Sequence, residues 1–177
     1  MLRRGSGQVV ENCDIRFGPD VTQSFGAIVY HADNGAARIA DSTITMDSDR
    51  IPAIQAVYQS GASGGAPTFQ NLRIDGEANR GYAVMVNGRD GTTFENCTIE
   101  QSGEDRDGIR LAYSDDCTLV DSRIDVTGFP LILRDSTLTI RNTTFVTPDG
   151  ERHVEEMEAG PGDFRPGTWA VGGETDA

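Results

Sequence analysis

Lysine is absent from this sequence of 177 residues, and all 15 of its basic residues are arginine. They are outnumbered by 28 aspartate and glutamate residues, which gives a net charge of −13 at pH 7 and a sequence pI of about 4.4. A field of this sign repels phosphate backbones and anionic membrane surfaces. Composition therefore argues against nucleic-acid and membrane partners.

Long apolar runs are also missing. None approaches the roughly 18 to 20 residues that span a bilayer. The start, Met1-Leu2-Arg3-Arg4-Gly5, has no apolar stretch after its basic pair, as a signal peptide would have. The sequence predicts neither a membrane span nor a standard signal peptide, so a chain that is complete as it stands would be cytoplasmic.

The absence of lysine together with the acidic excess indicates selection on the surface. The lysine ammonium needs an aqueous hydration shell, whereas carboxylates keep a surface solvated at high ionic strength, where screening weakens their mutual repulsion. The composition resembles that of a protein from a salt-accumulating, halophilic microbe. The alternative is a GC-rich genome with an acidic bias. Either way most carboxylates are expected to be solvated surface groups.

Cysteine and histidine are scarce. Cys13, Cys97 and Cys117 form no CxxC pair or Cys/His cluster, which argues against a zinc site. We expect these cysteines to be small buried apolar residues. His31 and His153 lie too far apart in the pattern to predict a catalytic dyad.

What the sequence does contain is a short repeat that reads apolar, any, Asn or Asp, small or apolar, any, apolar. The six copies are 10–15, 39–44, 69–74, 94–99, 119–124 and 140–145. Successive Asn or Asp positions are 29, 30, 25, 25 and 21 residues apart. A period of this length predicts a solenoid.

The parity within each copy predicts a bend. Phe94 and Ile99 cannot face the same side of an unbroken strand, in which side chains alternate with period two. Asn and Asp tolerate the left-handed backbone region better than other non-glycine residues, so Asn96 can turn the chain through a sharp corner. Stacked corners would also align the side chains for hydrogen bonding along the stack. The predicted corner residues are Asn12, Asp41, Asn71, Asn96, Asp121 and Asn142.

A third short apolar segment precedes most corners, so each rung is expected to carry three short strands. These segments are 27–30, 54–58, 84–86, 109–111 and 131–133. Three strands per turn with an Asn corner resembles the right-handed parallel β-helix of the pectate-lyase and polygalacturonase superfamily, over about residues 8 to 146. The fold class predicted is therefore all-β, a right-handed parallel β-helix of about six to seven rungs. Six rungs would stand about 29 Å tall.

Two parts follow from this pattern. Residues 1–146 are predicted to form the repeats, and 147–177 a polar loop with a last strand or cap near 168–171 and a frayed acidic tail. The first corner falls at Asn12, which leaves no room for the N-terminal capping helix usual in the resembled family. We expect further rungs or a partner to cover that end.

Enzymes of the resembled superfamily act on acidic polysaccharides at the outward face of the third strands, so candidate reactive residues are expected on that face. If alternation holds, that face carries Val29, Gln55, Met85, Arg110 and Leu131. Arg110 is the only candidate lyase base, and it would need a strongly lowered pKa.

For glycoside hydrolysis the best acid constellation is Asp90, Asp115 and Asp116, because aligning the corners places Asp90 and Asp115 on adjacent rungs. The polygalacturonase signatures with Gly-His-Gly and Arg-x-Lys are incomplete. No cofactor is expected, although the same three carboxylates offer oxygen ligands for calcium.

Tyrosines end three of the third strands. Tyr30, Tyr58 and Tyr113 could stack on sugar rings, or simply pack against one another. The first function hypothesis is a non-catalytic or degenerate β-helix module of a surface or extracellular protein, presenting an acidic face to polysaccharide or protein. The alternative is a carbohydrate-active enzyme, a polysaccharide lyase or glycoside hydrolase acting on acidic glycans.

Overall fold

The computed structural model describes residues 7–30, 36–57 and 65–166, and within them every regular element is a β-strand. These residues include no helix long and apolar enough to cross a bilayer. The strands are β1 (Gln8–Glu11), β2 (Asp14–Phe17), β3 (Ile28–Tyr30), β4 (Ala37–Met46), β5 (Ile54–Val57), β6 (Thr68–Gly76), β7 (Tyr82–Asn87), β8 (Thr93–Glu95), β9 (Thr98–Gln101), β10 (Asp107–Ala112), β11 (Cys117–Val120), β12 (Arg123–Val126), β13 (Leu131–Arg134), β14 (Leu138–Thr147), β15 (Gly150–Ala159) and β16 (Gly162–Phe164).

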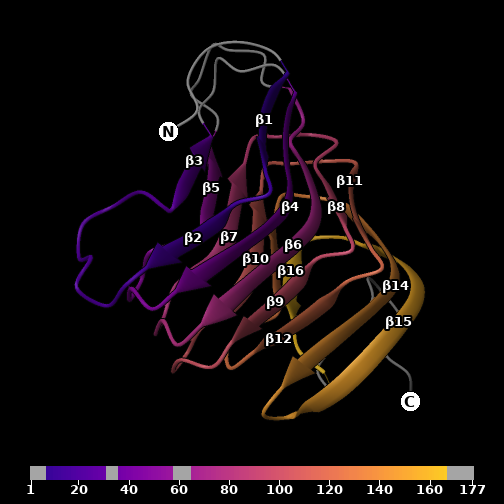
Figure 1. The fold of residues 1–177 in the computed structure, drawn as a ribbon. Helices are drawn as coiled ribbons and strands as arrows, with labels where there is room; N and C mark the ends of the chain where they lie inside the picture. The colour runs from indigo at the N-terminus through magenta and orange to yellow at the C-terminus, as the bar shows by residue number, and fades with distance from the viewer. Residues whose placement is uncertain (1–6, 31–35, 58–64, 167–177) are drawn as a thin grey trace.

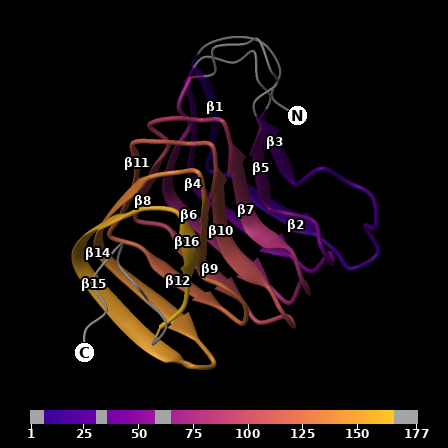
Figure 2. The same ribbon diagram turned by 180° about the vertical axis from the view of Figure 1, so that it is seen from behind.

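The strands form two sheets wound around one core, the right-handed parallel β-helix that the repeat predicts (Figures 1 and 2). The short sheet has the order β16-β13-β10-β7-β5-β3, and the long, bent sheet contains the other ten strands. Within the short sheet β3, β5, β7, β10 and β13 are parallel. The chain therefore makes about five turns rather than six to seven, because the copy at 140–145 is followed by a reversal of direction and not by another coil.

All six predicted corners adopt the left-handed conformation. The φ angles are 54° at Asn12, 49° at Asp41, 51° at Asn71, 50° at Asn96, 51° at Asp121 and 42° at Asn142. Side chains also link successive corners: Asn71 Nδ2 donates to Asp41 Oδ1 at 2.7 Å, and Asn96 Nδ2 donates to Asn71 Oδ1 at 2.8 Å. Each corner turns the residues that follow it back toward the interior. Apolar residues on both sides of a corner can therefore face the core, which they could not do in an unbroken strand.

The core is built from columns of equivalent side chains, one from each coil. Ile44, Ile74, Ile99 and Ile124 are register partners in adjacent strands and are all buried. Phe69 and Phe94 stack in the neighbouring column with ring centroids 4.8 Å apart. Identical side chains repeat at the strand spacing, so the column excludes water along the whole stack.

Cys97 and Cys117 are buried as expected and Cys13 is half-buried, and all three are free thiols. Burial raises the pKa of Cys97 and of Cys117 to about 11. These thiols therefore remain protonated at neutral pH and act as small apolar groups.

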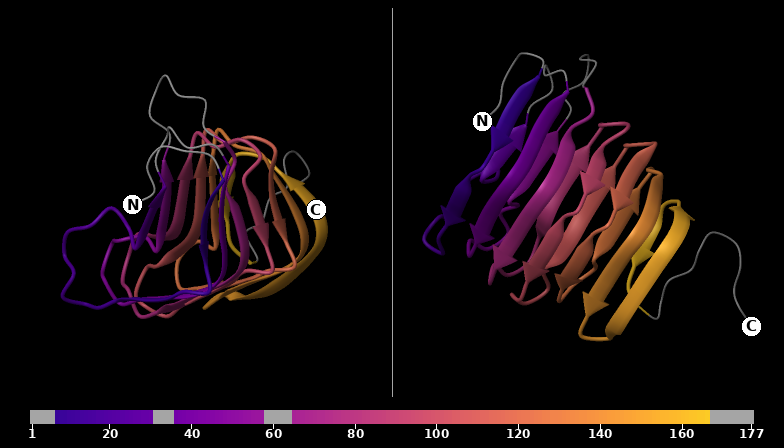
Figure 3. Two further views of the ribbon diagram at one scale, coloured as in Figure 1. Left: turned by 45° about the horizontal axis from the view of Figure 1, so that its top comes forward. Right: turned by 45° about the vertical axis from the view of Figure 1, so that its right-hand side comes forward.

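The segment after Val146 is not the polar loop that we expected. β15 runs antiparallel to β14 over its whole length, and β16 runs antiparallel to β13. Together they form a last coil of reversed direction that closes the C-terminal end of the stack (Figure 3). The last strand predicted at 168–171 lies outside the described residues, as does the tail.

Candidate functional site

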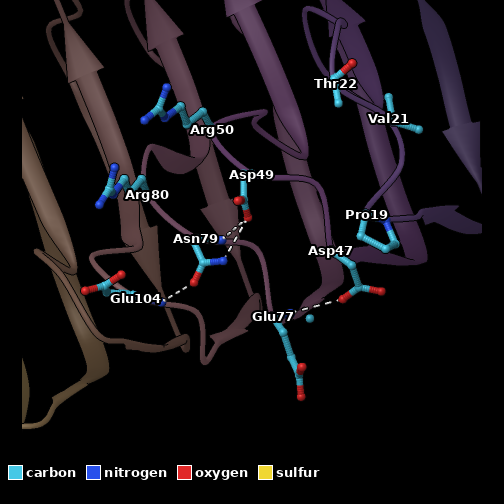
Figure 4. A pocket seen from close by; sticks show the side chains of 11 residues that line it. Pro19, Val21, Thr22, Asp47, Asp49, Arg50, Glu77, Asn79, Arg80 and Glu104 are labelled. Carbon is cyan, nitrogen blue, oxygen red and sulfur yellow. Dashed lines mark hydrogen bonds between the residues drawn. The ribbon is translucent and has the colours of Figure 1, made fainter.

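A wide groove runs across the turns that lead from the long sheet to the short sheet (Figure 4). Its volume is about 1140 Å³. The residues that line it come from three successive turns and from the loop after β2: Pro19, Val21, Thr22, Asp47, Asp49, Arg50, Gly76, Glu77, Asn79, Arg80 and Glu104.

A ladder of side-chain to backbone hydrogen bonds holds these turns in register (Figure 4). Asp49 Oδ1 accepts from both the backbone N–H and Nδ2 of Asn79 at 2.9 Å, and Asn79 Oδ1 accepts from the backbone N–H of Glu104 at 2.7 Å. The two bonds from Asn79 lower the pKa of Asp49, with smaller contributions from Arg50 and Arg106. Asp49 is therefore an ionised acceptor at neutral pH, which suits it to positioning and not to donating a proton.

Arg50 and Arg80 occupy equivalent positions on adjacent coils at one side of the groove. Their φ angles are 62° and 56°, so both lie in the left-handed region that arginine rarely adopts. The backbone N–H of Arg50 donates to the carbonyl of Asn79, and that of Arg80 donates to the carbonyl of Glu104, which fixes both residues in the stack. In Figure 4 the two side chains point in the same direction.

Neither of these two guanidinium groups forms a salt bridge among the described residues, although Arg50 lies close enough to Asp49 to help lower the pKa of that carboxyl. Both residues are exposed. Most of the other surface arginines, such as Arg38, Arg73 and Arg123, pair with aspartate or glutamate. In a chain with a net charge of −13, two adjacent arginines that form no salt bridge among the described residues depart from the pattern of most other surface arginines.

A third arginine supports this pair from inside. Arg106 is fully buried, and its Nη1 donates to the carbonyl of Arg80 at 2.7 Å while its Nη2 donates to the carbonyl of Ile51 at 2.9 Å. Burial lowers the pKa of Arg106 to about 10, against the opposing influence of Asp107 and Asp49. Arg106 therefore remains charged at neutral pH and ties together the backbone of three coils directly behind Arg50 and Arg80.

The predicted acid constellation lies elsewhere, in the turns that follow strands of the short sheet. Asp90 Oδ1 accepts from the backbone N–H of Asp115 at 2.8 Å, and Asp115 Oδ1 accepts from the hydroxyl of Thr137 at 3.2 Å. Asp116 has a φ of 55°, and its backbone N–H donates to Thr137 Oγ1. Asp90 and Asp115 are thus adjacent, as the alignment predicts, but each has an oxygen engaged in holding turns together.

No set of three or more His, Cys, Asp or Glu side chains in 7–30, 36–57 and 65–166 is placed to hold a metal ion. The predicted calcium ligands are among the residues covered by this search. Calcium binding stays a prediction.

Arg110 lies on the outward face of the short sheet, as alternation predicts. Its guanidinium carbon sits 5.4 Å from the centre of the Tyr82 ring, and it pairs in register with Met85 and Ile132. The prediction that Leu131 shares this face is wrong: Leu131 is fully buried and aligns with Ile109, because this coil has one residue fewer between its short-sheet strand and its corner, so Ile132 and not Leu131 is the partner of Arg110.

The three predicted sugar-stacking tyrosines have separate environments. Tyr30 is fully buried, its hydroxyl donates to the carbonyl of Gly65 at 3.2 Å, and the guanidinium of Arg89 covers its ring at 4.4 Å. Its ring therefore packs the fold and offers no face to a ligand. Tyr113 is 64% exposed with a φ of 51°. Tyr58 lies outside the described residues, as does His31.

The sequence did carry a signal for the groove arginines. Arg50 and Arg80 each stand nine positions after a corner residue, Asp41 and Asn71, and the same offset from Asn96 falls on Asp105. Aligning the loops by their distance from the corner would have placed the two arginines side by side.

A family model described as a right handed beta helix region matches residues 1–151 of the chain. Comparison with curated proteins and with solved structures found no match.

Proposed function

The chain belongs to the right-handed β-helix family, and from that premise we propose that it is a non-catalytic binding module that holds an acidic polysaccharide in the groove between coils. The observation that carries the proposal is the pair Arg50 and Arg80, exposed on adjacent coils with no salt bridge among the described residues. We place the module at a cell surface or in an extracellular assembly, the setting that the resemblance implies.

The spacing of the pair favours a polymer. Stacked strands are about 4.8 Å apart, so two guanidinium groups on adjacent coils present a repeated positive charge at that interval. Each guanidinium can bind a carboxylate through two parallel hydrogen bonds. A chain with a carboxylate on each sugar unit can engage both arginines at once, each through its own carboxylate.

The remaining lining supports the same ligand class. Asp47, Glu77 and Glu104 supply carboxylate oxygens that can accept hydrogen bonds from sugar hydroxyls. They also repel a polyanion wherever it does not meet an arginine, which fixes the position of the ligand along the groove. The buried Arg106 holds the backbone of this turn, so less conformational freedom is lost on binding.

The state of Asp49 favours binding over acid–base catalysis in the groove. Glycoside hydrolysis needs a carboxylic acid whose pKa is raised, and the pKa of Asp49 is lowered. Asp90 and Asp115, the alternative acids, lie in turns that do not line the groove. The enzyme alternative predicts turnover that Asp115→Ala/Asp116→Ala abolishes; the binding module predicts no turnover in either protein.

The test is calorimetric titration with an oligogalacturonate and with a neutral oligosaccharide of equal length, at low and high salt. We expect the acidic oligomer to bind and Arg50→Gln/Arg80→Gln to weaken it by about tenfold or more, since two charge-assisted contacts are lost. Arg123→Gln/Arg141→Gln is the matched control, because it removes the same charge from exposed, acid-paired arginines of the long sheet. Equal loss in both variants, or no binding by the wild type, contradicts the proposal.

A further inference from the structure

The two ends of the stack are finished differently. At the C-terminal end the reversed coil of β15 and β16 covers the last parallel coil, and Ile140 and Phe145 are fully buried beneath it. Val154, Ala159 and Phe164 of the reversed coil are buried with them. A coil that runs in the opposite direction can therefore pair with the edge strands of this β-helix and cover the apolar side chains of its core.

The N-terminal end has no such cover among the described residues. Within 7–30, 36–57 and 65–166, β1 and β2 pair only with β4, and β3 pairs only with β5. The interior side chains Val10, Ile15 and Phe17 are only partly buried, whereas their equivalents in the next coil are fully buried: Ile39, Ile44 and Met46. The loop between β2 and β3 runs out to the side of the stack (Figure 1).

The free edges also differ in charge. The edge strand β15 carries Glu151, Glu155, Glu156 and Glu158, and like-charged side chains protect an edge against pairing. The N-terminal edge presents Glu11, Asp14 and Arg16, and β15 stays net negative despite Arg152, so the C-terminal edge of another copy would meet the N-terminal edge with net repulsion. Growth of a chain of molecules, N-terminal end to C-terminal end, is disfavoured for this reason.

The N-terminal edges of two copies of the chain are instead complementary in charge. In β2 the sequence Asp14-Ile15-Arg16 places an acid, an apolar residue and a base in order, with Asp14 and Arg16 exposed and Ile15 turned to the core. Antiparallel pairing of two β2 strands about Ile15 sets Asp14 of each copy opposite Arg16 of the other and brings the two Ile15 side chains together. Directly opposed side chains in such a pair are about 4.5–5.5 Å apart, within reach of ion pairing.

We infer that the N-terminal end of the β-helix is the interface of a twofold-symmetric dimer, in which β2 pairs antiparallel with β2 of a second copy. A twofold axis through Ile15, perpendicular to the sheet, keeps inner faces with inner faces, so the two cores become continuous. The interface reproduces at this end the antiparallel coil contact that β15 and β16 make at the other. This inference does not depend on the groove or its ligand.

The experiment is sedimentation equilibrium of the full chain, whose monomer mass is 19.0 kDa, from micromolar to millimolar concentration. We expect a monomer–dimer equilibrium. Arg16→Asp sets carboxylates opposite carboxylates and should weaken the dimer by about tenfold or more. The double exchange Asp14→Arg/Arg16→Asp restores the opposed pairs and should restore the dimer.

Both side chains are exposed, Arg16 by 78% and Asp14 by 64%, so the variants keep the fold, which circular dichroism checks. A wild type that stays monomeric at millimolar concentration overturns the inference. So does growth beyond a dimer, or a dimer that Arg16→Asp leaves unchanged. Rescue by the double exchange would identify the register, since a merely structural effect of position 16 would not be reversed by a change at position 14.

Discussion

Replacing a corner residue tests the architecture directly, because each coil bends at its corner. Asn96 has a φ of 50° and donates through Nδ2 to Asn71 Oδ1 at 2.8 Å. In Asn96→Leu the left-handed backbone costs about 1–2 kcal/mol for a residue with a bulky side chain. Loss of the ladder hydrogen bond adds about 0.5–1.5 kcal/mol. The free energy of unfolding should therefore fall by about 2–3 kcal/mol.

Asn96→Asp is the matched control. Aspartate tolerates the left-handed region and occupies the same position in the coils of Asp41 and Asp121, both with positive φ, but it cannot donate to Asn71. It should lose only the hydrogen-bond part, about 1 kcal/mol. Urea unfolding measures both variants, and the thermal midpoint should fall by about 5–10 °C in Asn96→Leu. Equal losses in the two variants would refute the argument that the backbone conformation sets the cost.

Four further outcomes are expected. Arg106→Met should lower the free energy of unfolding by about 2–4 kcal/mol, since one buried and one partly buried carbonyl lose their donor; an unchanged urea midpoint would contradict the role of the buried arginine. At pH 8 iodoacetamide should label Cys13 in the native protein and leave Cys97 and Cys117 unlabelled, because burial raises their pKa to about 11; mass spectrometry of the labelled chain decides. The pKa of Asp49 is lower in the folded protein, so the stability that its carboxylate contributes is present at neutral pH and is lost as pH falls below about 4. Asp49→Asn should therefore lose less stability in acid than wild type, which urea titrations at successive pH values measure. If the acidic surface is adapted to a saline medium, the free energy of unfolding should rise from low to molar salt, and a flat response would favour genome bias.

The repeat was readable from sequence because each copy encodes its own geometry. Asn or Asp at the corner, with apolar residues on both sides at fixed distances, determines a bend, an inward row and a stacking period without any long-range information. Columns such as Ile44, Ile74 and Ile99 follow directly once the corners are aligned.

The closing coil could not be read in the same way because it breaks the repeat. β15 is exposed at most positions, so it has no apolar alternation to mark it as a strand. Its one local signal is the turn Thr147-Pro148-Asp149-Gly150, whose Pro-Asp-Gly order favours a tight reversal. The strand direction depends on pairing with β14, a tertiary contact.

The groove escaped prediction for a related reason. Arg50 and Arg80 lie in loops of different composition, and the role proposed for them rests on the absence of a salt bridge among the described residues, which only the fold reveals. Asp90 and Asp115 attracted notice as an acid pair, yet their proximity serves the turns that contain them.

The most direct test of the proposed function is to map the bound ligand by NMR, following backbone amide and arginine side-chain shifts while an oligogalacturonate is added. The account predicts that shifts concentrate at Arg50, Asn79 and Arg80. Shifts concentrated instead at Tyr82 and Arg110, on the outward face of the short sheet, would move the site to the place used by the resembled enzymes and contradict the groove as the binding surface.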